Sequence, residues 1–308
     1  MQTLLPDSLT YAEHASDIIE KAAALIGAAR PFALITSLSI EGGAARNVGS
    51  LALVEQGGSM TGYLSNGCID RDIQLHALDA LETGQQKLIR YGDGSRYADL
   101  KLPCGGALTV LIDPAPDTTA IVQAQAQFAA RQPATLTFRP DGQDVDHSFT
   151  YTPRHRLVLA GRGAIFRSMA QIGHAMDFDI RLLSPDAEDL KAVGHLSSAA
   201  ALHLTTPVAA PRLDMLDAGA AFLTLFHDHD WEPYLLAAAL ETPAHFIGSL
   251  GSRRTHALRC AALEEMGIAP ASLDRLHGPI GLVPSLRDAS SIAASTLAQI
   301  IAVFQRSG

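Results

Sequence analysis

The stretch LVLAGRGAIF at residues 157–166 decides the fold of the second half of the chain. It predicts a buried β-strand, a tight glycine turn and the first turn of a helix. Glycines let the backbone approach a phosphate, and the helix N-terminus adds N–H groups and partial positive charge. Phe166 stands at the third glycine position of the G-x-G-x-x-G fingerprint. The turn therefore predicts a phosphate site at Gly161, Arg162 and Gly163, or an ordinary strand-to-helix connection.

Downstream of this turn, short apolar strands alternate with helical patterns. The strand DIRLLS at 179–184 is followed by strands near ALHL, AAFLTLF and AHFIGSL. Near-continuous apolar strands separated by helices are typical of a parallel sheet that helices cover on both faces. We expect residues 154–308 to form a doubly wound, Rossmann-like domain. In such domains, the acid that binds a ribose lies about 20 residues after the glycine turn. Asp186 lies 25 residues after Gly161, slightly further along the chain.

Three further segments of this half carry polar or glycine-rich sequence after predicted strands. In a doubly wound sheet, ligands bind outside the carboxyl ends of the strands. FHDHD at 226–230 places His227 at such an end, for proton exchange or, less favourably, metal binding, while Asp228 or Asp230 is expected to cap the next helix. GSLGSRRT at 248–255 opens a helix with two arginines, which an anion such as phosphate would offset. The candidate residues there are Ser252, Arg253 and Arg254. HGPIGL at 277–282 indicates a rigid loop.

The first half of the chain has a different sequence pattern. An amphipathic helix at 15–29, with Ser16 as its expected cap, precedes a strand at 32–40 and a hairpin turning at Gly57-Gly58. A helix at 69–81 and two more strands complete a small α+β domain over residues 1–113. Residues 114–153 predict a connecting helix and two strands around the turn RPDGQD. The sequence does not decide to which domain this segment belongs.

Two of the three cysteines stand in glycine-rich loops. Cys68 follows Gly67 close to a predicted helix start, where the helix dipole stabilises a thiolate and free loop N–H groups could hold an anion. Cys104 precedes Gly105 and Gly106, in a loop that a ligand can approach closely. Each cysteine could equally be a small packed side chain. Cys260 lies in the helical run RTHALRCAALEEM and is expected to be a core residue.

The composition excludes several function classes. The chain has 308 residues, 47% of them hydrophobic and 18% charged, which supports a full core. Its formal net charge of -9 disfavours nucleic acids and anionic membrane surfaces as partners. The sequence shows no targeting segment, no membrane span, no CxxC and no HExxH, and three cysteines form no disulfide framework. We therefore expect a cytoplasmic protein.

Taken together and in this order, these segments resemble the XdhC/CoxI family, the accessory factors of xanthine dehydrogenase and related molybdenum hydroxylases. EGGAARNVGS, GYLSNGCID and PCGG are similar to the three glycine-rich segments of its N-terminal domain, including both cysteine positions. LAGRGAI, FHDHD, GSLGSRRTHALR and HGPIGL are similar to the motifs of its Rossmann-like domain. The loop here reads Ser65-Asn66-Gly67-Cys68 where the family has Ser-Gly-Gly-Cys, and Ser184-Pro185-Asp186 stands where it often has Asp-Pro-Arg.

The resemblance implies a protein that binds the molybdenum cofactor, a molybdopterin, as cargo while a sulfido ligand replaces an oxo ligand. It would then deliver the cofactor to a xanthine dehydrogenase-type apo-enzyme, with a cysteine desulfurase as sulfur source and a homodimer as its own state. Glycine-lined N–H groups and Arg253 or Arg254 suit the phosphate of molybdopterin. Molybdenum is thiophilic, so Cys104 or Cys68 could contact it. Cys104 is the residue that we name as the candidate metal contact.

Two other readings remain open from the sequence. An NAD(P)-dependent oxidoreductase would use the turn at Gly161–Gly163 for the pyrophosphate and His227 or His229 for proton transfer. A nucleotide-sensing regulator would bind the same ligand without catalysis. We favour the maturation chaperone, which has no turnover of its own. The sequence does not identify the hydroxylase served, or whether the cofactor carries a nucleotide.

Overall fold

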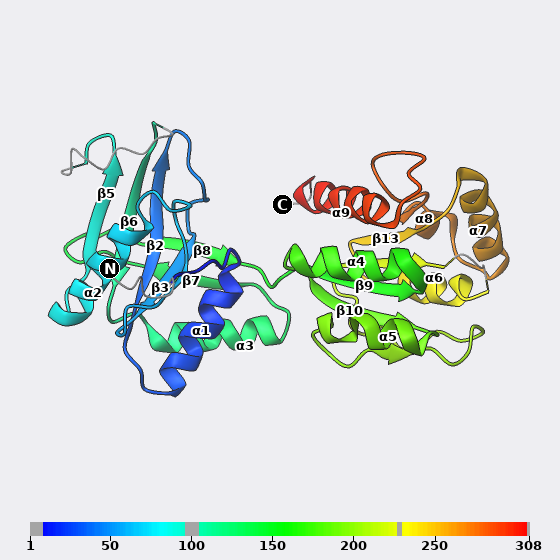
Figure 1. The fold of residues 1–308 in the computed structure, drawn as a ribbon, viewed down its shortest axis with the longest axis horizontal. Coiled ribbons are helices and arrows are strands. Elements are labelled where there is room, and N and C mark those ends of the chain that lie inside the picture. Colours follow the sequence, from blue (N-terminus) through cyan, green and yellow to red (C-terminus); the bar gives the residue numbers. More distant parts are fainter. Residues whose placement is uncertain (1–8, 96–104, 227–229, 307–308) are drawn as a thin grey trace, which may run out of the picture. The chain divides into compact units, whose positions relative to one another are not determined.

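The structure is a computed structural model that describes residues 9–95, 105–226 and 230–306. The chain divides into two compact units, residues 1–153 and 154–308. Figure 1 traces the elements of both units. Within the described ranges, no helix combines the length and apolar character that a bilayer span requires.

The first unit is built on a six-stranded sheet in the order β1-β4-β3-β2-β6-β5 (Figure 1). Neighbouring strands pair antiparallel except β1 and β4, which run parallel. The strands are β1 (Leu9–Thr10), β2 (Phe32–Glu41), β3 (Leu51–Glu55), β4 (Met60–Gly62), β5 (Lys87–Gly92) and β6 (Ala107–Asp113). The other elements are α1 (Ala15–Gly27), α2 (Asp70–Thr83), α3 (Thr118–Ala129), β7 (Ala134–Phe138) and β8 (His147–Tyr151).

Side chains of the first sheet alternate between two apolar clusters, one on each face. Ala33 and Ile35 of β2 pack with α2, whereas Leu34 of the same strand packs with α1. The period of two along a strand produces this division. Helix α3 and the β7–β8 hairpin, both from the segment 114–153, contribute to the α1 cluster. That segment therefore packs on the first sheet. The cap of α1 is His14, whose ring accepts from the Ser16 amide, so the expected role of Ser16 is wrong.

The second unit is a six-stranded sheet in the order β11-β10-β9-β12-β13-β14, with every neighbouring pair parallel. Counted along the unit, this is 3-2-1-4-5-6, the order of dinucleotide-binding folds, and it confirms the predicted Rossmann-like domain. The strands are β9 (Arg156–Gly161), β10 (Asp179–Ser184), β11 (Leu202–His203), β12 (Ala220–Leu225), β13 (Phe246–Ser249) and β14 (Leu276–His277). The helices are α4 (Gly163–Ala175), α5 (Ala187–Val193), the short η1 (Gly194–Leu196), α6 (Glu232–Leu240), α7 (Arg253–Glu265), α8 (Pro270–Leu273) and α9 (Ala289–Arg306).

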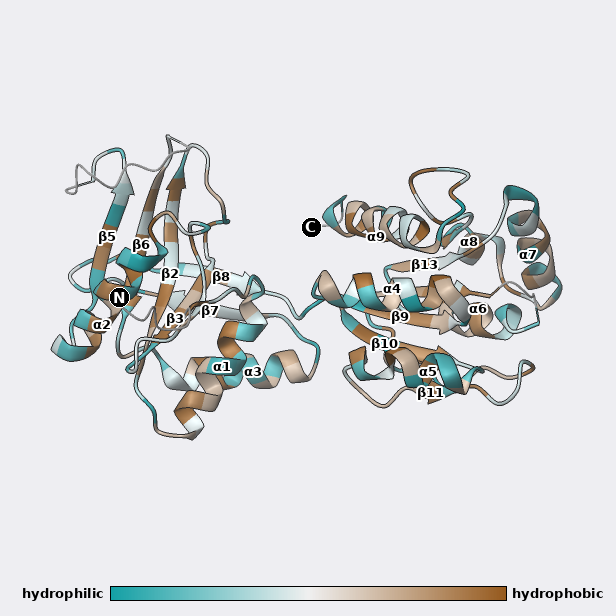
Figure 2. Ribbon diagram, in the orientation of Figure 1, coloured by the Kyte–Doolittle hydropathy of each residue, from teal (hydrophilic) through white to brown (hydrophobic). Residues whose placement is uncertain are grey.

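Helices cover both faces of this parallel sheet. Leu157 and Leu159 of β9 pack with α4 and α9, while Val158 and Ala160 pack with α6 and the neighbouring helix α7. Strand β9 is therefore buried along its whole length, which is why residues 157–161, after Arg156, are continuously apolar. Figure 2 shows β9 mostly in the brown of apolar residues.

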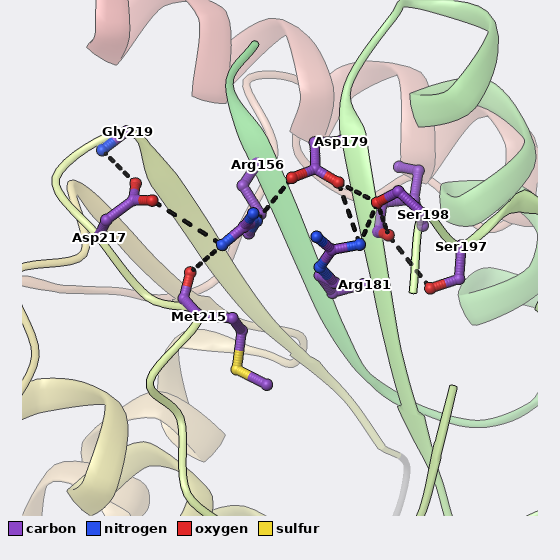
Figure 3. A network of polar contacts seen from close by, with 9 residues as sticks. Arg156, Asp179, Arg181, Ser197, Ser198, Met215, Asp217 and Gly219 are labelled. Carbon is purple, nitrogen blue, oxygen red and sulfur yellow. Dashed lines mark hydrogen bonds and ion pairs between the residues drawn. The ribbon is translucent and has the colours of Figure 1, made fainter. Parts of the chain in front are cut away.

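A polar network fixes the amino ends of these strands (Figure 3). Arg156 begins β9, is 7% exposed, and donates to Asp179 at 2.7 Å and to the Met215 carbonyl at 2.9 Å. Asp179 also pairs with Arg181, and Asp217 accepts from the Gly219 amide. The network lies at the end of the sheet opposite to the carboxyl ends, where ligands bind in such folds. Its role is therefore to hold the entry into β9, β10 and β12.

Replacing Arg156 with Met should destabilise the second unit by roughly 2 kcal/mol, because the half-buried Asp179 would lose one of its two arginine partners and the Met215 carbonyl would lose its side-chain donor. Arg139→Met is the matched control, since Arg139 and Asp146 form an ion pair that is largely exposed. Urea unfolding followed by far-ultraviolet circular dichroism measures both. Equal shifts in the two variants would contradict a structural role for Arg156.

Candidate functional site

Three glycine-rich connections of the first unit gather at one end of its sheet. β2, β4 and β5 end there, and β3 and β6 begin there, because these strands pair antiparallel. The connections after β2, β4 and β5 contain the sequences EGGAARNVGS, GYLSNGCID and PCGG. Cys104 lies outside the described residues. The topology thus brings together the three segments that the sequence singles out.

Glycine is required where these connections meet. A Cβ on Gly106 would lie 2.3 Å from the Gly43 carbonyl oxygen, and a Cβ on Gly92 would lie 2.1 Å from the Gly106 oxygen. A Cβ on Gly42 would lie 3.2 Å from the Gly106 Cα. Gly105 is exposed, and a Cβ added to it would meet no atom within 4 Å. Only its φ of +68° requires glycine at this position. Backbone therefore packs on backbone at this end of the sheet.

The loop that carries Cys68 is organised by a buried carboxylate. Asp70, 2% exposed, accepts hydrogen bonds from the amides of Leu64 at 2.7 Å, Ser65 at 3.2 Å and Gly67 at 2.6 Å. It also accepts from the Ser65 hydroxyl, which in turn accepts from the Ile69 amide. The expectation that these amides are free to hold an anion is therefore wrong for Leu64, Ser65 and Gly67. They hold the loop shape instead.

Cys68 is exposed at the tip of this loop. Asn66 adopts φ 55° and Gly67 φ 101°, so Asn66 takes a left-handed conformation at a position where the family pattern has glycine. Cys68 stands one residue before Ile69, the N-cap of α2, while Asp70 and Asp72 occupy the first turn. These carboxylates oppose the helix dipole. The loop presents the thiol to solvent, and the stabilisation of its thiolate by the helix dipole stays a prediction.

An aromatic and charged cluster that sequence reasoning missed adjoins this loop. The Tyr63 hydroxyl donates to the Glu13 carboxylate, which raises the pKa of Tyr63. The Arg46 guanidinium lies 4.7 Å from the centre of the Tyr63 ring and donates to the Glu13 carbonyl. Tyr11 packs edge-on against the same ring. Arg46 belongs to EGGAARNVGS, so it brings a cation to the glycine-rich end of the sheet.

In the second unit, the glycine turn after β9 is occupied by a carboxylate of the chain itself. The Gly163 amide, at the start of α4, donates to Asp189 at 2.6 Å. Asp189 is 2% exposed, and its other oxygen pairs with Arg167. Glycine is required at position 161, because a Cβ there would lie 2.6 Å from the side chain of Leu225 in β12. Arg162 is exposed. A phosphate at this turn would meet the buried charge of Asp189.

The acid that the sequence offers for a ribose, Asp186, caps a helix. Asp186 caps α5 and accepts from the amides of Glu188 at 2.8 Å and Asp189 at 3.1 Å. Ser184, fully buried at the end of β10, accepts from the Asp186 amide. Asp186 therefore has a structural use that the spacing alone did not reveal.

The segment FHDHD falls mostly outside the described residues, which omit His227, Asp228 and His229. Asp230 does not cap α6, because the N-cap is Trp231 and has no side-chain cap. In the described ranges, no group of three or more His, Cys, Asp or Glu side chains could hold a metal ion.

The turn from β13 into α7 carries the remaining predicted residues. Ser252 is the N-cap of α7 and accepts from the Thr255 amide at 3.1 Å. Arg253 and Arg254 are exposed, and neither has an ion-pair partner in the described part of the chain. Ser252 and Arg253 line an open cavity of about 750 Å³ at the carboxyl ends of β13 and β14.

A buried ion pair holds the turn from β13 into α7 in place. Glu232 and Arg259 are 1% and 6% exposed, and Arg259 donates twice to Glu232, at 2.9 and 3.1 Å. Arg259 also donates to the Leu250 carbonyl at 2.8 Å, and Ser249 donates to Glu232 at 2.9 Å. The pair thus ties the start of α6 to the turn that leads into α7.

Cys260 lies on α7 itself, one helical turn after His256. It is partly buried, its sulfur lies 3.7 Å from the His256 Nε2, and burial raises the pKa of its thiol. His277 stacks on Phe246 with ring centres 4.4 Å apart. Burial lowers the pKa of both histidines; Arg259 adds to this for His256, and His256 adds to it for His277. A protonated, half-buried thiol fits the expected packing role of Cys260.

Comparisons with known proteins agree on one family. A family model for the XdhC Rossmann domain matches residues 157–300, and one for the XdhC and CoxI family matches residues 25–92. The chain is 28% identical over 284 residues to the molybdenum cofactor insertion chaperone PaoD of Escherichia coli strain K12, covering 88% of this chain and 82% of PaoD. It is 26% identical over 274 residues to the uncharacterized protein YqeB of the same organism.

The match to YqeB covers 89% of this chain but 43% of YqeB, so the chain spans less than half of that relative. A solved structure described as a xanthine dehydrogenase from Bacillus halodurans is similar with a TM-score of 0.75 and 20% identity. That match covers 94% of this chain and 96% of the other. At this identity it supports the fold alone.

The glycine contacts predict that Gly106→Ala will destabilise the first unit. The added Cβ must displace the Gly43 or Glu41 carbonyl, at a cost of roughly 2 kcal/mol, the middle of the usual range for overpacking. Gly27→Ala is the matched control, because its Cβ meets nothing within 4 Å and it lies in α1. Urea unfolding is the measurement. A Gly106→Ala protein as stable as the control would disprove the close packing.

The lowered pKa values of His256 and His277 predict an acid-sensitive second unit. Unfolded histidine titrates near 6.5. The pKa values of the two histidines are lower in the folded protein than in the unfolded chain. As the pH falls below about 7, the unfolded chain therefore binds more protons than the folded protein. The free energy of unfolding decreases from that pH down to the pKa of the folded state. His277→Gln should therefore reduce the loss of unfolding free energy between pH 7.5 and 5.5. An unchanged pH slope in the variant would contradict this assignment.

Proposed function

Because the chain belongs to the XdhC and CoxI family, we propose that it is a molybdenum cofactor maturation chaperone. In this proposal it binds molybdopterin as cargo, holds it while a sulfido ligand replaces an oxo ligand, and delivers it to a xanthine dehydrogenase-type molybdenum hydroxylase. The molybdenum cofactor insertion chaperone PaoD, similar over most of both chains, supports this direction.

The observation that carries the proposal is the glycine-rich end of the first sheet. The exposed thiol of Cys68 lies on one of its loops, and Cys104 precedes Gly105 on another. Thiolates are soft ligands and suit a thiophilic metal. A Cβ on Gly67 or Gly105 would meet no atom within 4 Å, so these two positions leave room for a ligand to approach, and Arg46 adds a positive charge for an anionic cargo. A site that holds and releases a molybdenum complex needs this chemistry.

The partners follow from the same proposal. Sulfuration needs a sulfur donor, for which we propose a cysteine desulfurase, and the acceptor is the apo-hydroxylase. We further propose a cytoplasmic homodimer without turnover of its own. The net charge of -9 agrees with protein and small-molecule partners rather than nucleic acid or membrane.

The alternative function, an NAD(P)-dependent oxidoreductase at the turn of Gly161 to Gly163, is opposed by Asp189. That carboxylate accepts from the amide that a pyrophosphate would use, and it is buried within 2.6 Å of it. Asp186 is engaged as a helix cap rather than left for a ribose. We therefore place the cargo away from this turn.

Cofactor capture tests the proposal. The purified full-length protein is incubated with molybdenum cofactor, free ligand is removed, and pterin fluorescence and molybdenum per chain are measured. We expect about one cofactor per chain for a single built site. Cys68→Ala or Cys104→Ala should lower the retained molybdenum, whereas Cys260→Ala, at a protonated and partly buried thiol, is the matched control and should not.

Full retention by both Cys68→Ala and Cys104→Ala would remove the thiols as molybdenum contacts. No retained pterin in the wild-type protein, together with NAD(P) binding, would overturn the carrier function and favour the oxidoreductase.

A further inference from the structure

Two tyrosines, a glutamate and an arginine meet at the glycine-rich end of the first sheet. β1 and β4 run parallel, so the chain leaves both strands at this end. Tyr11 and Glu13 follow β1, and Tyr63 follows β4. Arg46 lies in the connection after β2. We call these four residues the Glu13 cluster. It adjoins the loop that carries Cys68, so it lies where the proposed function places the cargo.

The buried ring of Tyr63 holds the Glu13 cluster together. Tyr63 is 8% exposed, and its hydroxyl donates to the Glu13 carboxylate. The Arg46 guanidinium lies 4.7 Å from the centre of this ring and donates to the Glu13 carbonyl. The ring of Tyr11 packs against it in a T-shaped arrangement, with ring centres 5.2 Å apart. These contacts place the three outer side chains before a ligand arrives, which lowers the cost of ordering them on binding.

Each outer side chain keeps a binding group open to solvent. Tyr11 is 56% exposed, so much of its ring is accessible. Glu13 is exposed; one carboxylate oxygen takes the Tyr63 hydroxyl, and the other accepts from no group in the described part of the chain. Arg46 is partly exposed and, within the same ranges, pairs with no carboxylate. The cluster thus offers an aromatic ring, a carboxylate and a guanidinium together.

This set of groups complements a flat heterocycle with the hydrogen-bonding edge of guanine, which a pterin shares. That edge carries an amino group, a ring N–H and a carbonyl oxygen in a row. A carboxylate accepts from two neighbouring donors at once, and a guanidinium donates to the carbonyl oxygen. Proteins that bind a single base combine such edge contacts with stacking on an aromatic side chain. An adenine edge pairs its amino group with a ring-nitrogen acceptor, which a carboxylate repels.

We propose that the Glu13 cluster binds the guanine-like edge of a heterocycle, with Glu13 on its two N–H groups, Arg46 on its carbonyl oxygen and Tyr11 against the face of its ring. That the heterocycle is the pterin of the cargo rests on the proposed function. A guanine base carries the same edge and is the other source of this chemistry. The recognition uses neither a phosphate nor a metal, so it is independent of the cysteine thiols.

A fluorescence titration of the full-length protein with neopterin tests this inference. Neopterin has the ring and its edge but no phosphate, dithiolene or metal. Glu13→Gln should weaken binding by at least about tenfold, because the amide replaces one acceptor with a donor that opposes an N–H of the ligand. Glu20→Gln, at an exposed glutamate of α1 outside the cluster, is the matched control and should leave the affinity unchanged.

Two further substitutions test the ring and the carbonyl contact. Tyr11→Ala should weaken neopterin binding by about tenfold through lost stacking, whereas Tyr11→Phe, which keeps the ring, should retain it. Tyr234→Ala, at a tyrosine of α6 that is 42% exposed, is the control for the loss of an exposed ring. Arg46→Gln should also weaken binding, whereas Arg139→Gln, at an exposed arginine paired with Asp146, should not.

Competition with nucleosides distinguishes the two sources of the edge. Guanosine that displaces neopterin would support recognition of the shared edge, and guanosine that does not would restrict the ligand to a pterin. Displacement by adenosine would overturn the inference. So would a wild-type protein that does not bind neopterin, or equal affinities of Glu13→Gln and Glu20→Gln, even if the protein captures molybdenum cofactor. Glu13-dependent binding of neopterin without cofactor capture would support this site while contradicting the proposed function.

Discussion

The carboxylate of Asp70 holds the amides of Leu64, Ser65 and Gly67 while it is almost completely buried. A glycine-rich loop exposes backbone donors that must be satisfied, and a carboxylate that accepts several of them fixes the loop at once. In the second unit, Asp189 does the same for the turn before α4 by accepting from Gly163. Both turns look like anion sites in the sequence, yet the chain supplies the anion itself. The positions left for an external ligand depend on these two carboxylates.

This constraint divides the chemistry between the units. In the first unit the loop amides hold Cys68 in an exposed position, and a thiol remains available for a soft metal. In the second unit the turn at Gly161 and Gly163 is occupied, while the α7 terminus keeps two cations and an open cavity beside it. The Glu232–Arg259 pair, buried between α6 and α7, supports that terminus through the Leu250 carbonyl.

The fold could be predicted because its signals are periodic. The buried strand at 157–161 and the alternation of strands and helices after it predict the parallel sheet, and the structure confirms it. The role of the glycine turn could not be predicted, because Asp189 is distant in sequence and looks like an ordinary helix residue. Arg46 was missed because its partner, the Tyr63 ring, lies on another loop. The cavity beside Arg253 depends on how loop 279–286 packs on α9, and no local pattern specifies that.

We propose that this chain holds the molybdenum cofactor and passes it on. The most direct measurement loads the full-length protein with sulfurated cofactor, removes free cofactor, and adds a molybdenum-free hydroxylase. Hydroxylase activity and the pterin bound to each protein are followed over time. The account predicts that pterin moves to the hydroxylase and activity appears faster than with the same amount of free cofactor. Pterin that stays on this chain, or activation no faster than with free cofactor, would contradict it.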